Sequence, residues 1–150
     1  MAYVISNDEL PHSRTAYRFE GYRYGETNVS FFLTDAPPGS GPELHAHPYA
    51  EVFVIQEGDV TFTVGDATIE ATGGQIVVVP AGVPHKFVNS GAGRLRQIDI
   101  HASATPQKSA WRAWPKEACR WAALSPDLRN GHYMHAFCGE KAHGVALSIG

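Results

Sequence analysis

Residues 51–64 have the sequence EVFVIQEGDVTFTV, in which the turn residues Glu57-Gly58-Asp59 separate two apolar runs. From Val60 to Val64, apolar and hydroxyl side chains alternate with the two-residue period of a pleated strand, so one face of this run is expected to be buried. The first run, Glu51 to Gln56, is rich in β-branched and aromatic residues, which favour strands. The stretch therefore predicts two strands joined by a short turn.

Similar runs continue on both sides of this stretch and are separated by glycine and proline. A β-rich segment precedes it, and four more strand-like segments follow it: Asn28–Thr34, then Ala67–Thr72, Gln75–Val79, His85–Asn89 and Arg94–His101. Strands that recur every 8 to 12 residues with turn residues between them are typical of an antiparallel sandwich or barrel. No pair of long helical patterns supports an α/β alternative, so the predicted fold class is all-β.

Length and charge exclude several classes of protein. The chain has 150 residues, enough for one domain, and a net charge of -3, which offers no basic stripe for a nucleic-acid backbone. The start of the chain lacks a basic segment followed by an apolar run, and no segment approaches 18 consecutive apolar residues, so neither export nor a membrane location is expected. The two cysteines lack a CxxC spacing and suit a reducing compartment. We therefore expect a cytoplasmic protein.

Three histidines and one glutamate form a candidate metal site. His45 and His47 are two residues apart, so on a strand both side chains point to one face. Glu51 can join them only if the chain folds back within residues 48–50, where Pro48 favours such a reversal. His85 enters from a later strand. The set suits one divalent ion of iron, manganese, nickel, copper or zinc; the alternative is that these are ordinary polar residues at the mouth of a barrel.

Two spaced motifs contain these four residues and resemble the two cupin motifs. The positions of the first are Gly39, His45, His47, Glu51 and Gly58, and those of the second are Gly74, Pro80, Gly82, His85 and Asn89. The resemblance covers about Gly21 to His101 and implies a small single-domain cupin, a double-stranded β-helix or jelly roll that holds a divalent metal. It also implies that His45, His47, Glu51 and His85 are the ligands and that the glycines, Pro80 and Asn89 form turns.

The expected organisation has three parts. Residues 1–20 form an N-terminal strand or arm, residues 21–102 form the barrel, and residues 103–150 form an appendage of unknown role. Alternation is lost in the appendage, which we expect to be partly helical or disordered. A short helix is predicted from Pro115 to Leu124, because proline suits the first turn of a helix and Pro126 follows its end.

The catalytic candidates are Glu51, as a ligand and base, and His101, as a proton-transfer group. His101 shares one face of its predicted strand with Gln97 and Asp99. That face either looks into the pocket or is the solvated outer face, with Ile98 and Ile100 on the other side. The adjacent loop residue Tyr49 either contacts the substrate or only packs.

The resemblance implies a metal-dependent enzyme that acts on a small molecule, with a dioxygenase as the most specific expectation. Three imidazoles and one carboxylate leave roughly two positions of an octahedron for dioxygen, water or substrate. The alternative is a small-molecule sensor or binding module in which the metal holds the ligand or the fold. Because an open sheet edge invites pairing, a homodimer is expected.

Overall fold

The chain consists of two units, Met1–Trp111 and Arg112–Gly150. The computed structural model describes residues 2–106, 109–110, 120–122 and 135–137. In the first unit these residues form strands, apart from loops and two 3-10 turns, Asn7–Glu9 (η1) and Gly21–Arg23 (η2). The predicted all-β class is confirmed. Among the residues described, no helix has the length and hydropathy needed to span a membrane.

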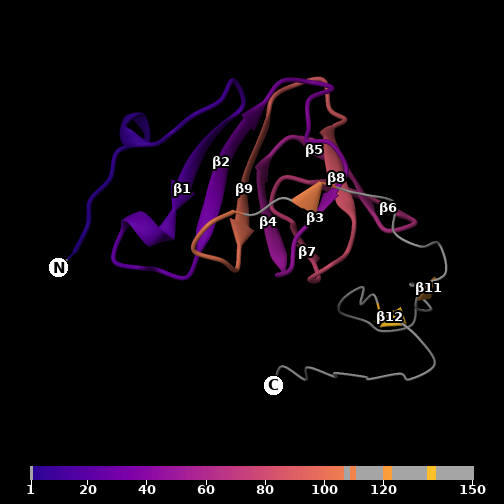
Figure 1. Cartoon of the computed structure of the whole chain (residues 1–150). Helices are drawn as coiled ribbons and strands as arrows, with labels where there is room; N and C mark the ends of the chain where they lie inside the picture. The colour runs from indigo at the N-terminus through magenta and orange to yellow at the C-terminus, as the bar shows by residue number, and fades with distance from the viewer. Residues whose placement is uncertain (1, 107–108, 111–119, 123–134, 138–150) are drawn as a thin grey trace, which may run out of the picture. The chain divides into compact units, whose positions relative to one another are not determined.

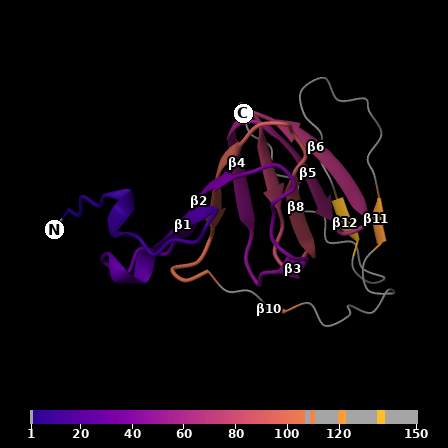
Figure 2. The same cartoon turned by 90° about the horizontal axis from the view of Figure 1, so that it is seen from above.

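Two five-stranded antiparallel sheets build the first unit (Figures 1 and 2). The first sheet has, in spatial order, the strands β1 (Ala16–Glu20), β2 (Ser30–Ala36), β9 (Leu95–His101), β4 (Glu51–Glu57) and β7 (Ile76–Val79). The second has β10 (Ser109–Ala110), β3 (His45–Ala46), β8 (His85–Asn89), β5 (Asp59–Val64) and β6 (Ala67–Thr72). Consecutive strands such as β4 and β5 lie in different sheets, as the predicted jelly roll requires.

The interior between the sheets is filled by the inward positions that the alternation predicts. Phe53, Phe62 and Phe87 are buried, and their ring centroids lie 4.8 to 5.9 Å apart. Such contacts, together with the burial of the rings, are the main favourable term in a core of this kind. Leu95 at the start of β9 is fully buried in the same interior.

Strand β9 turns its polar side inward. Gln97, Asp99 and His101 are 0%, 5% and 1% exposed, whereas Ile98 and Ile100 are half-buried on the opposite face. The pocket-facing alternative is therefore the correct one. The isoleucines tolerate the outer position because they lie among other apolar side chains, in register with Val54 and Val52 of β4.

The outer face of the first sheet is apolar across all five strands. We define this outer apolar face by two rows of cross-strand neighbours, Phe19-Phe31-Ile100-Val52-Val78 and Tyr17-Leu33-Ile98-Val54-Ile76. Its most exposed members are Ile76 at 63% and Val78 at 59%. Contiguous apolar patches on a protein surface are typical of interaction sites.

Turns fall where the motif glycines predict them. Gly39, Gly58, Gly74 and Gly82 all have φ between +77° and +92°, a conformation that side chains with a Cβ rarely adopt. Asn89 at the end of the second motif donates from Nδ2 to the carbonyls of Ala36 and Gly93, which closes that end of the barrel.

Beyond residue 102 the description is partial. Ser109–Ala110 (β10) pairs with His45–Ala46 (β3) at the edge of the second sheet. In the second unit, Arg120–Ala122 (β11) pairs with His135–Phe137 (β12). Residues 120–122 of the predicted Pro115–Leu124 helix are thus a strand, paired with a segment 13 or more residues further along. The other residues of that predicted helix lie outside the described part of the chain.

Candidate metal site

Three short elements bring the four predicted ligands together at one end of the barrel. His45 lies on β3, His47 follows it directly, Glu51 is the first residue of β4, and His85 is the first residue of β8. The chain folds back between His47 and Glu51, as the spacing predicts, and the amide of Gly82 donates to the carbonyl of His47 at 2.6 Å. All four side chains are buried, with exposures between 1% and 7%.

Register places three of the ligands and His101 in two cross-strand pairs. His45 of β3 is opposite His85 of β8 in the second sheet, and Glu51 of β4 is opposite His101 of β9 in the first. Directly opposed side chains on one face are close neighbours. The two sheets therefore each contribute one such pair to the same end of the interior.

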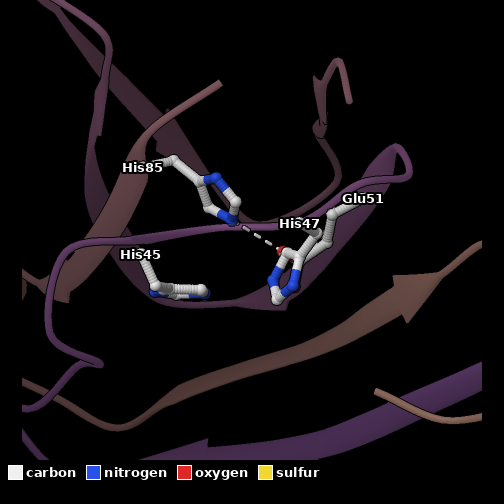
Figure 3. A group of neighbouring side chains, drawn as sticks. All are labelled: His45, His47, Glu51 and His85. Carbon is white, nitrogen blue, oxygen red and sulfur yellow. Dashed lines mark hydrogen bonds and ion pairs between the residues drawn. The ribbon is translucent and has the colours of Figure 1, made fainter. Parts of the chain in front are cut away.

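The donor atoms fit one metal ion. One ligand atom from each of His45, His47, Glu51 and His85 lies within 4.8 Å of all the others, and the four side chains converge in Figure 3. Bonds of about 2.1 Å around one ion place ligand atoms about 3 Å apart when adjacent and about 4.2 Å apart when opposite. Shifts of a few tenths of an ångström thus bring the four atoms to bonding distance.

Backbone carbonyls fix the orientation of two of the imidazoles. His45 Nδ1 is 2.6 Å from the carbonyl oxygen of Glu43, and His85 Nδ1 is 2.8 Å from that of Val83. Because a carbonyl only accepts, Nδ1 donates in both residues, and Nε2 is then available as a ligand atom. This arrangement of the outer ring nitrogen is usual for histidines that bind metals.

Glu51 contacts two histidines of the cluster. Glu51 Oε2 is 2.7 Å from His85 Nε2, marked by the dashed line in Figure 3, and 3.1 Å from His47 Nε2. Burial alone would raise the pKa of the Glu51 carboxyl, but hydrogen bonds from His47 and His85 and the charges nearby lower it to about 2. Nε2 of His85 faces this carboxylate, while Nδ1 of the same ring already donates to a carbonyl. A proton or a metal ion is therefore needed between Nε2 and the carboxylate.

His101 lies beside this cluster, as its candidate role requires. Its Nε2 is 3.2 Å from Glu51 Oε1. Burial lowers the pKa of the imidazole to about 4, with Glu51 opposing that change, so the ring is neutral at pH 7. Its buried Nδ1 has no hydrogen-bond partner within the described residues. Tyr49 stacks on His47, with ring centroids 5.1 Å apart, and meets His101 edge-on at 5.7 Å.

A cavity of about 210 Å³ opens beside the ligands. Since a water molecule occupies roughly 30 Å³, it has room for roughly seven waters or a ligand of similar size. Its lining residues are Ser13, Thr15, Ala16, Phe32, Thr34, Ala36, Gly41, Pro42, His45, Glu51, Phe53, Phe87, Asp99 and His101. Sequence reasoning missed Ser13, Thr15 and Thr34, because a hydroxyl in a loop or strand carries no motif.

Part of the barrel matches a known protein family. The family model described as a cupin domain matches residues 32–101. The HTH-type transcriptional regulator PuuR of Escherichia coli is 29% identical over 79 residues, which are 53% of this chain and 43% of that protein. An uncharacterized protein of Streptomyces coelicolor is 37% identical over 62 residues, 41% of this chain and 59% of that one. The chain thus matches less than half the length of the regulator.

Solved structures share the fold at low identity. Oxalate decarboxylase OxdC of Bacillus subtilis aligns with a TM-score of 0.60 and 22% identity, over 68% of this chain and 29% of that one. Another structure of that enzyme is described with Mn(II) centres. It aligns with a TM-score of 0.59 and 21% identity, over 67% of this chain and 29% of that one. The plu4264 protein of Photorhabdus luminescens aligns with a TM-score of 0.54 and 16% identity, over 67% of this chain and 86% of that one.

Proposed function

This chain carries a cupin domain over residues 32–101, and on that premise we propose that it is a metal-dependent enzyme that acts on a small molecule. One observation carries the proposal: His45 and Glu51 belong both to the group of four ligands and to the wall of the cavity. A metal held there would face the cavity with roughly two coordination positions left for a substrate or dioxygen.

In this proposal the four ligands His45, His47, Glu51 and His85 hold the ion, and His101 moves a proton. A bound transition metal supplies Lewis-acid chemistry and, for a redox-active ion, chemistry with dioxygen. His101 is neutral, lines the cavity and directs its Nε2 to Glu51. A neutral imidazole in that place can accept a proton from a substrate hydroxyl or amine. The reaction class that we favour is oxidation by dioxygen.

Manganese or iron is the ion that we propose. Imidazole and carboxylate ligands suit both. Support for manganese comes from a structurally similar enzyme, the oxalate decarboxylase of Bacillus subtilis, which is described with Mn(II) centres. Elemental analysis of the purified protein, with about one equivalent of either metal expected, tests this choice.

The test of function is dioxygen consumption by the manganese- or iron-loaded protein over a panel of small hydroxy and amino compounds that fit the cavity. Turnover is expected with the parent protein, and none with Glu51→Ala, which loses a ligand. His101→Gln should retain about one equivalent of metal and lose turnover. Loss of metal in that variant would contradict the role in proton transfer, and no turnover by any loaded form would contradict the enzyme.

The second candidate is a small-molecule sensor or binding module. The observation in its favour is the similarity of 79 residues to a transcriptional regulator. In that case the loaded protein would bind a member of the same panel tightly without consuming it or dioxygen. Calorimetry on the same samples therefore separates the two functions.

We also propose a homodimer in which the outer apolar faces of two copies cover each other. A twofold axis allows the same patch to cover itself. The charges at one end of the face are already paired within the chain, Arg94 with Asp35 and Arg96 with Glu57, so an identical face meets no excess charge there. Sedimentation should give a dimer for the parent and for Val88→Lys on the other sheet, and a monomer for Val54→Lys. A monomeric parent would contradict the proposal.

A further inference from the structure

Ser30 lies beside His101, on the side away from the proposed metal site. It is the first residue of β2 and is opposite His101 of β9, which is itself opposite Glu51 of β4. Directly opposed side chains share one face of a sheet, with Cβ atoms about 5 Å apart. A hydroxyl, an imidazole and a carboxylate therefore form one row across three neighbouring strands.

The hydroxyl of Ser30 is buried and unpaired. The residue is 0% exposed, and its Oγ has no hydrogen-bond partner within the described part of the chain. A buried hydroxyl without a hydrogen bond is destabilising, whereas alanine in its place would leave no polar group to satisfy. An unpaired hydroxyl in this place therefore points to a neighbouring group that it serves.

His101 offers a group that matches this hydroxyl. Neither of its buried ring nitrogens has a hydrogen-bond partner among the residues described, although Nε2 is 3.2 Å from Oε1 of Glu51. The two nitrogens of an imidazole are directed to different sides of the ring. With Nε2 toward Glu51 on β4, Nδ1 is directed away from that strand, and β2 with Ser30 is the other neighbour of β9.

The other polar side chain opposite Ser30 is already engaged. Glu20 of β1 is directly opposite Ser30. Its Oε2 accepts a hydrogen bond from Arg23 Nε at 2.8 Å, and its Oε1 is 3.3 Å from Arg18 Nε. Since a hydroxyl both donates and accepts, Ser30 can accept a hydrogen from Nδ1 of His101 without taking a partner from Glu20.

We propose that Ser30 is a positioning residue, whose hydroxyl accepts the hydrogen of His101 Nδ1, directly or through one water molecule. With the hydrogen on Nδ1, Nε2 keeps its lone pair, which is the state that a base at this atom requires. The carboxylate of Glu51 would otherwise favour the hydrogen on Nε2, because a carboxylate only accepts. This inference rests on the proposed function and names the residue that prepares His101 for it.

The position of the hydrogen on His101 tests the proposal. Nitrogen NMR of the protein with isotope-labelled histidine distinguishes a ring nitrogen that carries hydrogen from one that does not. The protein is loaded with zinc, which has no redox chemistry. The signals of His101 are identified by their loss in His101→Gln. The parent protein should carry the hydrogen on Nδ1.

Ser30→Thr and Ser30→Val separate the hydroxyl from packing. The two new side chains have the same shape, and only the first has a hydroxyl. Ser30→Thr should keep the hydrogen of His101 on Nδ1, whereas Ser30→Val should move it to Nε2. Thr63→Val, which removes a half-buried hydroxyl of β5 in the other sheet, should change neither nitrogen. If the larger side chains prevent folding, Ser30→Ala takes the place of Ser30→Val.

Turnover gives a second readout. The substrate is any compound of the hydroxy and amino panel that the iron- or manganese-loaded parent protein oxidises. The value of kcat should be at least about tenfold lower in Ser30→Val than in Ser30→Thr, because the base at Nε2 is lost. KM should agree within about twofold, since Ser30 does not line the cavity.

The possible failures can be distinguished by the metal content of each sample. About one equivalent of zinc with the hydrogen on Nε2 in the parent protein overturns the role of Ser30 and leaves the proposed metal site intact. The same nitrogen carrying hydrogen in Ser30→Thr and Ser30→Val, or equal kcat values, does the same. Absence of zinc, manganese and iron after loading overturns the proposed function, and with it this inference, because His101 then has no reaction to serve.

Discussion

At one end of the barrel interior the strands β4, β8 and β9 place Glu51, His85 and His101, whereas toward the other end β4 and β9 place Ile55 and Leu95. Both ends are buried, yet one consists of ionisable groups that contact one another and the other of apolar side chains. The difference indicates that the apolar end supplies most of the folding free energy. The polar end is stable only while each charge has a partner, which a bound metal ion would provide.

The largest effect is expected from removing a ligand. His85→Ala takes one imidazole from the cluster and should lower the affinity for the metal by at least about 100-fold, since even changes to groups behind the ligands cost 10- to 100-fold. Metal content after dialysis measures the loss. His12→Ala, which changes an exposed histidine, should keep the parent content. An unchanged content in His85→Ala would mean that the polar end does not bind a metal through this residue.

A change at the apolar core should act on stability alone. Phe62 is fully buried between Phe53 and Phe87, and Phe62→Ala should reduce the free energy of unfolding by about 3–5 kcal/mol. Denaturant titration with and without metal should give the same reduction, because Phe62 belongs neither to the four ligands nor to the cavity wall. A reduction that depends on metal would show that the two ends are coupled.

Smaller effects are expected at the turns. Gly58 has φ +92°, and an added Cβ would lie 2.6 Å from the carbonyl oxygen of Arg94, whereas at Gly74, with φ +91°, nothing lies within 4 Å. Gly58→Ala should therefore cost about 2–3 kcal/mol and Gly74→Ala about 1 kcal/mol in unfolding free energy. Equal costs would mean that backbone conformation alone accounts for both. Neither variant should change the metal content.

The smallest effect is expected on the surface. Arg96 and Glu57 lie 3.9 Å apart, with side chains 61% and 69% exposed. An exposed pair of this kind contributes little, so Arg96→Ala should change the free energy of unfolding by less than about 0.5 kcal/mol. Thermal melts of the parent and the variant at low and high salt measure this change in stability. A larger loss would indicate that the end of the sheet contributes to stability in another way.

The sequence was sufficient to predict the main strands between Ser30 and His101 and to bring the four ligands together. Both follow from local patterns, namely the period of alternation and the spacing of histidine, glutamate, glycine and proline. It did not decide which face of β9 looks inward, because Gln97, Asp99 and His101 are polar and the rule that apolar residues are buried favours Ile98 and Ile100. That rule fails here because the interior contains a polar site and the exterior is an apolar sheet face.

Contacts between distant segments could not be predicted from the sequence either. The cavity wall includes Ser13 and Thr15, from the loop before β1, and the bond between Thr34 and Asp99 joins residues 65 positions apart. The strand at Arg120–Ala122 is a further case, because its partner β12 begins at His135. No local pattern encodes which segments pair, so such features require the tertiary structure.

The two cross-strand pairs at the ligand end would give the proposed metal binding a further use. His45 faces His85 in one sheet and Glu51 faces His101 in the other, and a slip of one residue in either pairing would turn a ligand to the opposite face. A molecule folded in the wrong register therefore lacks the complete site. If the site holds the proposed metal, metal in solution would favour correctly aligned chains over slipped ones, so the ion would act as a check on folding accuracy as well as a cofactor.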